Sequence, residues 1–215
     1  AARNMEVYGP LLEAVFRRDG IPAYISRRSD ILEKPVLTML LSAVDAVTGG
    51  FEYEDVFRCL KTGMAGITAA ECDVLENYVI RWEIRGGMWL RETDWTASPD
   101  GYGAELNEVR RQRLAEVNAV RRRVRGLFYD LSEGLKAGET VRDKAEVLYR
   151  FAESAGVPET LERQTAALYD DGQVQLAEEY RQLWSIFCGV LDQFVELLGD
   201  VEVDGQEFAR LLRLV

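Results

Sequence analysis

The stretch VFRRDGIPAYISRRSDILEKP, residues 15–35, sets the order of the first secondary-structure elements. An apolar-periodic segment runs up to Gly20, which can adopt the left-handed conformation that ends a helix, and Pro22 prevents the helix from continuing. Residues 23–25 are apolar and favour extended structure, so they are predicted to form a short buried strand. A new helical pattern begins at Ile31. The predicted order is therefore helix, Gly-Ile-Pro, strand, loop and helix.

Beyond this stretch, long patterns with a 3.6-residue period and only five prolines in 215 residues favour a mainly α, bundle-like fold. Thr68 and Glu71 have the spacing of a capping box, which marks a helix start. The longest predicted helices span residues 104–136 and 174–198. The inward face assigned to the second of them consists of Leu176, Tyr180, Leu183, Trp184, Phe187, Val190, Leu191, Phe194, Leu197 and Leu198.

Several classes of chemistry are excluded by residues that the sequence lacks. It contains no histidine, so it offers no imidazole base and no histidine metal ligand. A phosphate loop needs Gly-Lys-Ser/Thr, but Lys61-Thr62 follows Leu60. None of the four lysines has an acidic residue two positions before it, as a RecB-type nuclease signature requires. We therefore expect no catalytic residue, no cofactor and no metal in this chain.

The cysteine content and the hydropathy indicate the cellular location of the protein. The three cysteines are odd in number and widely spaced, which favours a reducing cytoplasm over a disulfide framework. No apolar run approaches the roughly 20 residues of a membrane span. The expectation is a cytoplasmic protein without membrane contact.

The charge is distributed unevenly along the chain. The net charge is −11, yet residues 105–125 carry seven arginines and three glutamates, which is +4, so the remaining residues sum to −15. At about 100° per residue, Arg111, Arg122 and Arg125 fall on one flank of the apolar stripe, while Arg113 falls inside it. The flank residues could bind DNA phosphates or an acidic neighbouring subunit, or they could pair with carboxylates of this chain. We favour intrachain pairing.

The order helix, Gly-Ile-Pro, strand, loop and helix resembles the fourth helicase motif of superfamily-1 helicases, where the second motor domain leads into an inserted helical domain. Further residues resemble the AddB subunit family of AddAB helicase–nucleases, and they are Val56-Phe57-Arg58, Leu60-Lys61-Thr62-Gly63, Gly66-Ile67-Thr68, Glu76-Asn77-Tyr78-Val79, Trp82, Arg85-Gly86, Trp89 and Trp95. The resemblance implies that residues 1–48 are the edge of a second motor-like domain. Residues 49–215 would be its helical insertion (2B-like) domain, and one or two short strands are expected.

The resemblance also suggests where DNA would be contacted. In the related helicases, a Gly-Ile-Gly turn of the inserted domain touches the duplex backbone. The corresponding residues here are Gly66-Ile67-Thr68, and Lys61 is near in sequence. Free amides at the helix start near Thr68 would favour an anion, although the glycines could simply serve a tight turn. The candidate phosphate contacts are Lys61, Gly66, Ile67, Thr68, Arg111, Arg122 and Arg125.

By resemblance, the parent complex is an ATP-dependent helicase and exonuclease that unwinds and resects DNA ends in recombinational double-strand break repair. ATP would be used in an AddA-like partner subunit, and each subunit would carry a nuclease domain. This chain is then expected to be a non-catalytic middle region that acts as scaffold, subunit contact and guide for duplex DNA. Two alternatives stay open. One is the inserted domain of an active superfamily-1 helicase, and the other is a free-standing helical adaptor.

Overall fold

The structure is a computed structural model that describes residues 5–21 and 34–214. The chain divides between Lys34 and Pro35 into two compact units. In the first, α1 (Met5–Arg18) is followed by Gly20 with φ of 67°, and the Ile21 N–H donates to the Phe16 carbonyl oxygen at 2.9 Å. This closing bond confirms the predicted glycine-terminated helix. The strand predicted at residues 23–25 lies outside the described residues.

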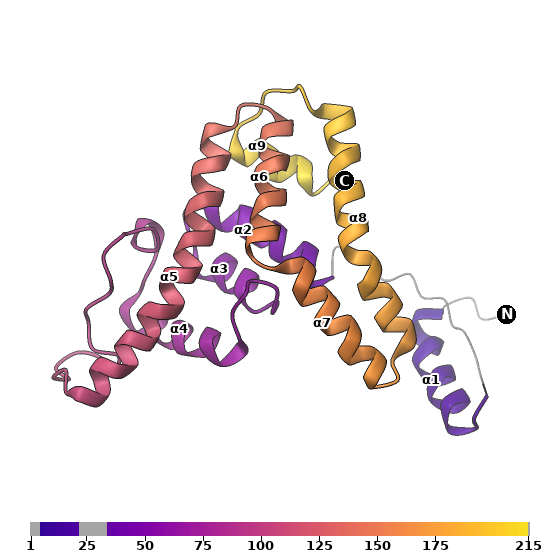
Figure 1. The fold of residues 1–215 in the computed structure, drawn as a ribbon, viewed down its shortest axis with the longest axis horizontal. Coiled ribbons are helices and arrows are strands. Elements are labelled where there is room, and N and C mark those ends of the chain that lie inside the picture. Colours follow the sequence, from indigo (N-terminus) through magenta and orange to yellow (C-terminus); the bar gives the residue numbers. More distant parts are fainter. Residues whose placement is uncertain (1–4, 22–33, 215) are drawn as a thin grey trace. The chain divides into compact units, whose positions relative to one another are not determined.

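The second unit is built from helices that follow one another along the chain (Figure 1). Most of the connections are short, but a long loop fills the stretch between residues 88 and 108. They are α2 (Pro35–Thr48), α3 (Tyr53–Leu60), α4 (Ala69–Trp82), the 3-10 turn η2 (Gly86–Met88), α5 (Glu108–Ala137), α6 (Val141–Ser154), α7 (Val157–Asp170), α8 (Val174–Leu198) and α9 (Gly205–Leu212). The mainly α prediction is confirmed. Among the described residues, strand-type pairing is limited to one antiparallel bridge between Thr140 and Glu202.

Helix α2 lies at the centre of the second unit, because it packs against α3, α5 and α9. It is apolar nearly all round, as a helix enclosed by neighbours should be, and Met39, Leu40, Ala43 and Val44 are almost completely buried. The compact units thus divide ahead of α2. The assignment of residues 1–48 to a motor-like domain and 49–215 to an inserted domain stays a prediction.

Helix α8 has the predicted bounds of 174–198, but its buried face is narrower than the sequence suggested. In the second unit it packs mainly against α6 and α7. Leu183, Phe187, Leu191 and Phe194 are buried there, whereas Leu197 is 79% exposed. The inward assignment of Leu197 was therefore wrong. This residue lies at the edge of the apolar stripe, about 60° around the helix from Phe194, and two neighbouring helices do not cover so wide an arc.

Helix α5 begins four residues later than predicted. The Asn107 side chain caps it by accepting a hydrogen bond from the Arg110 N–H at 3.0 Å. In Figure 1, α5 is the long diagonal helix, with α4 beside its N-terminal half and α6 beside its C-terminal half. The residues between η2 and α5 form a long loop, and arginines of α5 contact it.

Candidate functional site

The turn from Lys61 to Thr68 is shaped by packing as well as by conformation. Gly66 has φ of 68°, and a Cβ atom there would lie 3.1 Å from the carbonyl oxygen of Ala155 at the end of α6. Glycine is therefore required at this position by both its dihedral angle and its neighbour. Ile67 is buried, so its side chain is not available to a ligand. Lys61 forms an ion pair with Glu76 at 2.6 Å.

The start of α4 already holds a negative charge. The Thr68 N–H donates to Oε2 of Glu71 at 2.8 Å, and the Glu71 N–H donates to Oγ1 of Thr68 at 3.2 Å, which confirms the capping box. Arg123 from α5 pairs with the same carboxylate. The hydrogen bond from the Thr68 backbone, together with Arg123, lowers the pKa of Glu71. A DNA phosphate at this helix end would have to approach an ionised carboxylate, and its binding there stays a prediction.

Acidification is expected to weaken this cap. Because the folded pKa of Glu71 is lowered, its contribution to stability is complete above the unfolded value of about 4.3 and is lost as pH falls through the folded value. Glu71→Gln keeps the shape but cannot ionise. The difference in melting temperature between wild type and Glu71→Gln should be largest near neutral pH and shrink below about pH 4. A difference that stays constant at all pH values would contradict this prediction.

The seven arginines of α5 between residues 105 and 125 all have partners within the chain. Of the three on the predicted flank, Arg111 pairs with Glu108 at 3.4 Å, and Arg122 pairs with Asp94 at 2.7 Å. Arg125 donates from Nε to the Leu90 carbonyl oxygen at 2.9 Å. Arg122 and Arg125 thus hold the same loop, whereas Arg111 lies at the far end of α5.

The other four arginines make the same kind of contact. Arg110 and Arg113 both pair with Asp100, at 2.7 and 3.5 Å. Arg123 pairs with Glu71, and Arg121 donates to the Arg91 carbonyl oxygen. On the predicted flank, Arg111 and Arg122 thus pair with carboxylates as the favoured alternative expects, while Arg125 bonds a carbonyl oxygen. Binding of DNA or of a partner by this flank stays a prediction. The arginine-rich helix binds the loop to the helical core, and the ends of Arg111 and Arg122 are still more than half exposed.

The arginine with the largest structural role was missed by the sequence analysis. Arg121 is completely buried, and its guanidinium lies 5.0 Å from the centre of the Trp95 ring. Asn118, one turn earlier, exchanges two hydrogen bonds of 2.9 Å with the Trp95 backbone. The sequence does contain a signal for the burial of Arg121, because this residue follows the apolar Val117 by four positions and therefore lies on the same face of the helix. Arg113, which periodicity places in the stripe, reaches the surface and pairs with a carboxylate, since its side chain is 60% exposed and lies 3.5 Å from Asp100.

Metal sites and membrane spans find no support in the described part of the chain. Within residues 5–21 and 34–214, no three acidic or cysteine side chains come together in a way that could hold a metal ion. Over the same ranges, no helix is long and apolar enough to cross a membrane.

No protein-family model matches the chain. Comparison with curated proteins, however, finds several relatives that share one name. It is 33% identical over 211 residues to the B subunit of the ATP-dependent helicase/deoxyribonuclease of Clostridium botulinum (strain Loch Maree / Type A3). It is 34% identical over 212 residues to the protein of that name from Acetivibrio thermocellus. Each alignment covers 98% of this chain and 18% of the relative.

A third relative of the same name, from Desulforudis audaxviator, is 34% identical over 220 residues and is covered to 19%. Over nearly all of its length, the chain is thus similar to one limited part of these B subunits. It belongs to the AddB family, which comprises the B subunits of ATP-dependent helicase/deoxyribonucleases. The chain spans less than a fifth of the length of these relatives.

Proposed function

We propose that this chain is a non-catalytic region of an AddB-like subunit in a cytoplasmic helicase–nuclease complex that resects DNA ends. It acts there as a scaffold, as a contact for an AddA-like partner and as a guide for duplex DNA. The observation that carries the proposal is the alignment of 98% of the chain with a limited part of the AddB relatives. Arginines that clamp a loop to a helical core suit a scaffold, because they fix a shape instead of leaving charges free for chemistry.

The chain by itself is expected to hydrolyse no ATP and to cut no DNA. The sequence lacks a phosphate loop, a histidine and an acidic residue two positions before any lysine. The purified chain should be assayed with magnesium and manganese on ATP, on duplex DNA and on single-stranded DNA. Metal-dependent cleavage that is abolished by replacing Asp170 and Asp171 would contradict the proposal. The partner contact is tested separately, by co-purification of the full-length protein with its partner.

Guidance of duplex DNA by the arginine flank has a quantitative consequence. If Arg111, Arg122 and Arg125 each neutralise a phosphate, the log–log salt dependence of binding should have a slope of about −3. The −15 carried by the remaining residues opposes approach, so binding should be weak near physiological salt. Changing all three arginines to glutamine should flatten the slope by about that amount. The matched control is Arg150→Gln on α6, since Arg150 is exposed and paired with Glu146.

The result of these salt titrations separates two roles. Duplex binding that is unchanged in the triple variant would leave the three arginines with their intrachain contacts alone. Loss of partner association with unchanged DNA binding would identify a subunit interface. A melting curve is needed for the triple variant, because Arg122 and Arg125 also hold the loop.

A further inference from the structure

An exposed aromatic side chain is held in a fixed position near the end of the loop that precedes α5. Tyr102 is 90% exposed, yet its ring centre lies 4.7 Å from that of Trp82, with 54° between the ring planes. Gly101 and Gly103, on either side, have φ of 104° and 73°, values that other residues rarely adopt. The two glycines allow the turn that places the tyrosine ring beside Trp82. We call the paired rings of Trp82 and Tyr102 the aromatic platform.

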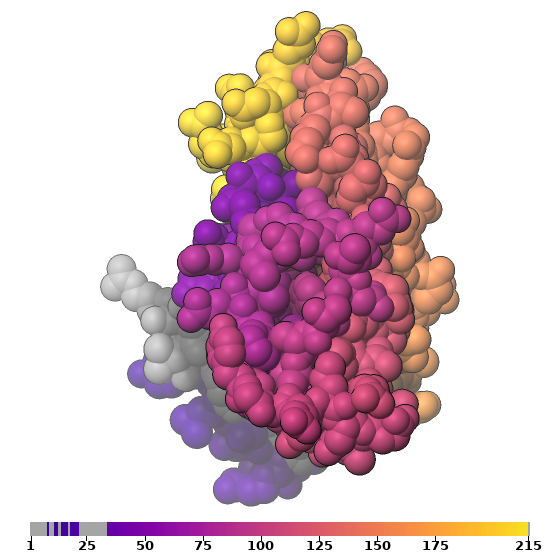
Figure 2. Space-filling model, turned by 90° about the vertical axis from the view of Figure 1, so that its left-hand side faces the viewer, coloured from indigo at the N-terminus to yellow at the C-terminus, as the bar shows by residue number. Residues whose placement is uncertain are grey.

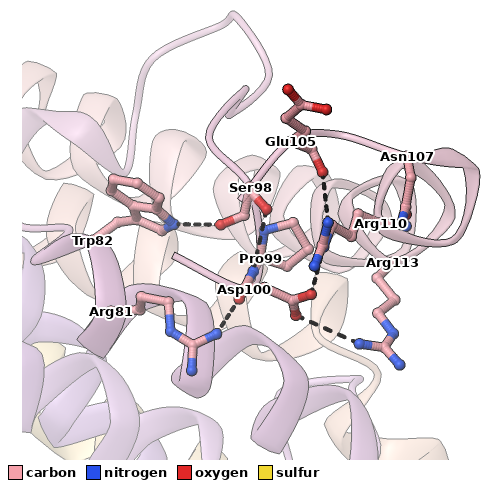
Figure 3. Close-up of polar contacts among 9 residues, drawn as sticks. All are labelled: Arg81, Trp82, Ser98, Pro99, Asp100, Glu105, Asn107, Arg110 and Arg113. Carbon is pink, nitrogen blue, oxygen red and sulfur yellow. Dashed lines mark hydrogen bonds and ion pairs between the residues drawn. The ribbon is translucent and has the colours of Figure 1, made fainter. Parts of the chain in front are cut away.

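Side chains at the end of α4 hold the loop that leads to Tyr102 through hydrogen bonds to its backbone, two of which are drawn in Figure 3. The Trp82 indole N–H donates to the Ser98 carbonyl oxygen at 3.0 Å. The neighbouring Arg81 guanidinium donates to the Pro99 carbonyl oxygen, and the Tyr78 hydroxyl donates to that of Ala97 at 3.2 Å. Three successive carbonyl groups of the loop are thus tied to one helix. This part of the loop backbone is therefore already held in place before a ligand binds, which lowers the entropy cost of binding.

Three arginines surround Asp100, which precedes Tyr102 by two residues in the loop. Figure 3 shows Arg81, Arg110 and Arg113 around Asp100, while the Glu105 carboxylate points away from the cluster. Arg110 donates to Asp100 at 2.7 Å and to the Glu105 carbonyl oxygen at 2.9 Å. The hydrogen bond from Arg110, together with the charges of Arg110, Arg113 and Arg81, lowers the pKa of Asp100. The three arginines outnumber the single carboxylate that they surround, so the cluster keeps an excess of positive charge that can attract a phosphate.

One of these arginines can change its partner easily. Arg113 is 60% exposed and lies 3.5 Å from Asp100, an arrangement typical of weak surface ion pairs. It can therefore exchange Asp100 for a phosphate at little cost. In Figure 2, the loop and the first turns of α5 form a continuous part of the surface that faces the viewer.

We propose that the aromatic platform, with Arg81, Arg110 and Arg113, is a binding site for single-stranded DNA. An unpaired base stacks on Tyr102, and Arg113 holds an adjacent phosphate. Proteins that bind single strands combine aromatic rings with a positively charged surface in this way. A duplex is a poorer ligand, because its bases are already stacked on each other and cannot reach a ring. The inference rests on the proposed function only in taking DNA as the ligand.

The test compares labelled oligothymidylate, the same strand paired with oligoadenylate, and an abasic strand, by fluorescence anisotropy with the 215-residue chain. Tyr102→Ala should raise the Kd for oligothymidylate about tenfold, since removing a stacked aromatic residue typically has an effect of this size. It should leave the duplex and the abasic strand unaffected. Tyr102→Phe should bind like wild type, because it keeps the ring. Arg113→Gln should flatten the salt slope by about 0.7.

A matched control is available in Tyr169, which is 39% exposed and hydrogen-bonded to Glu178 on an acidic hairpin. Tyr169→Ala should not change binding. The proposal is overturned if wild type does not bind oligothymidylate at low salt, or if Tyr102→Ala binds it normally. Equal loss on the duplex or on the abasic strand also overturns it. Loss of partner association without loss of DNA binding would make the platform a protein contact. In each case, inactivity of the chain towards ATP and DNA cleavage would still support the proposed function.

Discussion

Arg121→Ala is expected to lower the free energy of unfolding of the second unit by about 3 kcal/mol. The substitution removes the hydrogen bond from the guanidinium to the part-buried Arg91 carbonyl oxygen, and a hydrogen bond that involves a charged group contributes about 1.5–3 kcal/mol. It also removes the cation–π contact with Trp95, which contributes about 1–2 kcal/mol when desolvated. The Asp94 carboxylate is 43% exposed and can be solvated, so its loss of a partner adds little.

A second substitution of Arg121 separates the effect of the lost charge on stability from the effect of the lost side-chain volume. Burial lowers the pKa of Arg121, which shows that the charge is costly to keep inside the protein. Arg121→Met fills most of the space without that cost, so it should lose only about 1 kcal/mol. Urea unfolding of both variants, followed by tryptophan fluorescence, measures the difference. Arg150→Ala on the exposed face of α6 is the control. An Arg121→Ala loss no larger than that of the control would contradict the assigned role.

Local sequence signals predicted most of the helices, because they depend on neighbours in the chain. The capping box at Thr68 and Glu71 and the bounds of α8 both follow from local chemistry, and both are confirmed. Gly66 shows where local reasoning is incomplete. A tight turn explains its positive φ, but the close approach to Ala155 depends on a helix about 90 residues further along the chain.

The candidate site was harder to predict, because the partners of its arginines lie in a loop without periodicity. Periodicity placed Arg122 and Arg125 on one flank, and both do contact the same loop. It could not show that Asp94 and the Leu90 carbonyl would face them. The Trp82–Tyr102 pair was missed for the same reason, since the two rings are 20 residues apart and meet only when the loop folds back onto α4.

The second large effect is expected from Leu191→Asp in α8. Leu191 is 5% exposed and belongs to the buried face towards α6. The substitution removes apolar contacts and places a carboxylate on a largely buried face, so we expect a loss of at least about 3 kcal/mol. That is a large share of the roughly 5–15 kcal/mol that stabilises a typical domain. Chemical denaturation and the far-ultraviolet spectrum measure the outcome.

The matched control on the same helix is Leu197→Asp, because Leu197 is 79% exposed. This change should alter stability by no more than about 0.5 kcal/mol. In Leu191→Asp, burial should raise the folded pKa of the introduced carboxyl group above the unfolded value of about 3.9. Leu191→Asp should therefore recover relative to Leu191→Asn as pH falls towards about 4. A harmless Leu191→Asp would have one of two explanations. Either α8 does not pack through this face, or Arg142, which lines a surface pocket together with Leu191, reaches the new carboxylate. Repeating the measurement with Arg142→Gln distinguishes the two, since only a rescued carboxylate would lose stability in that background.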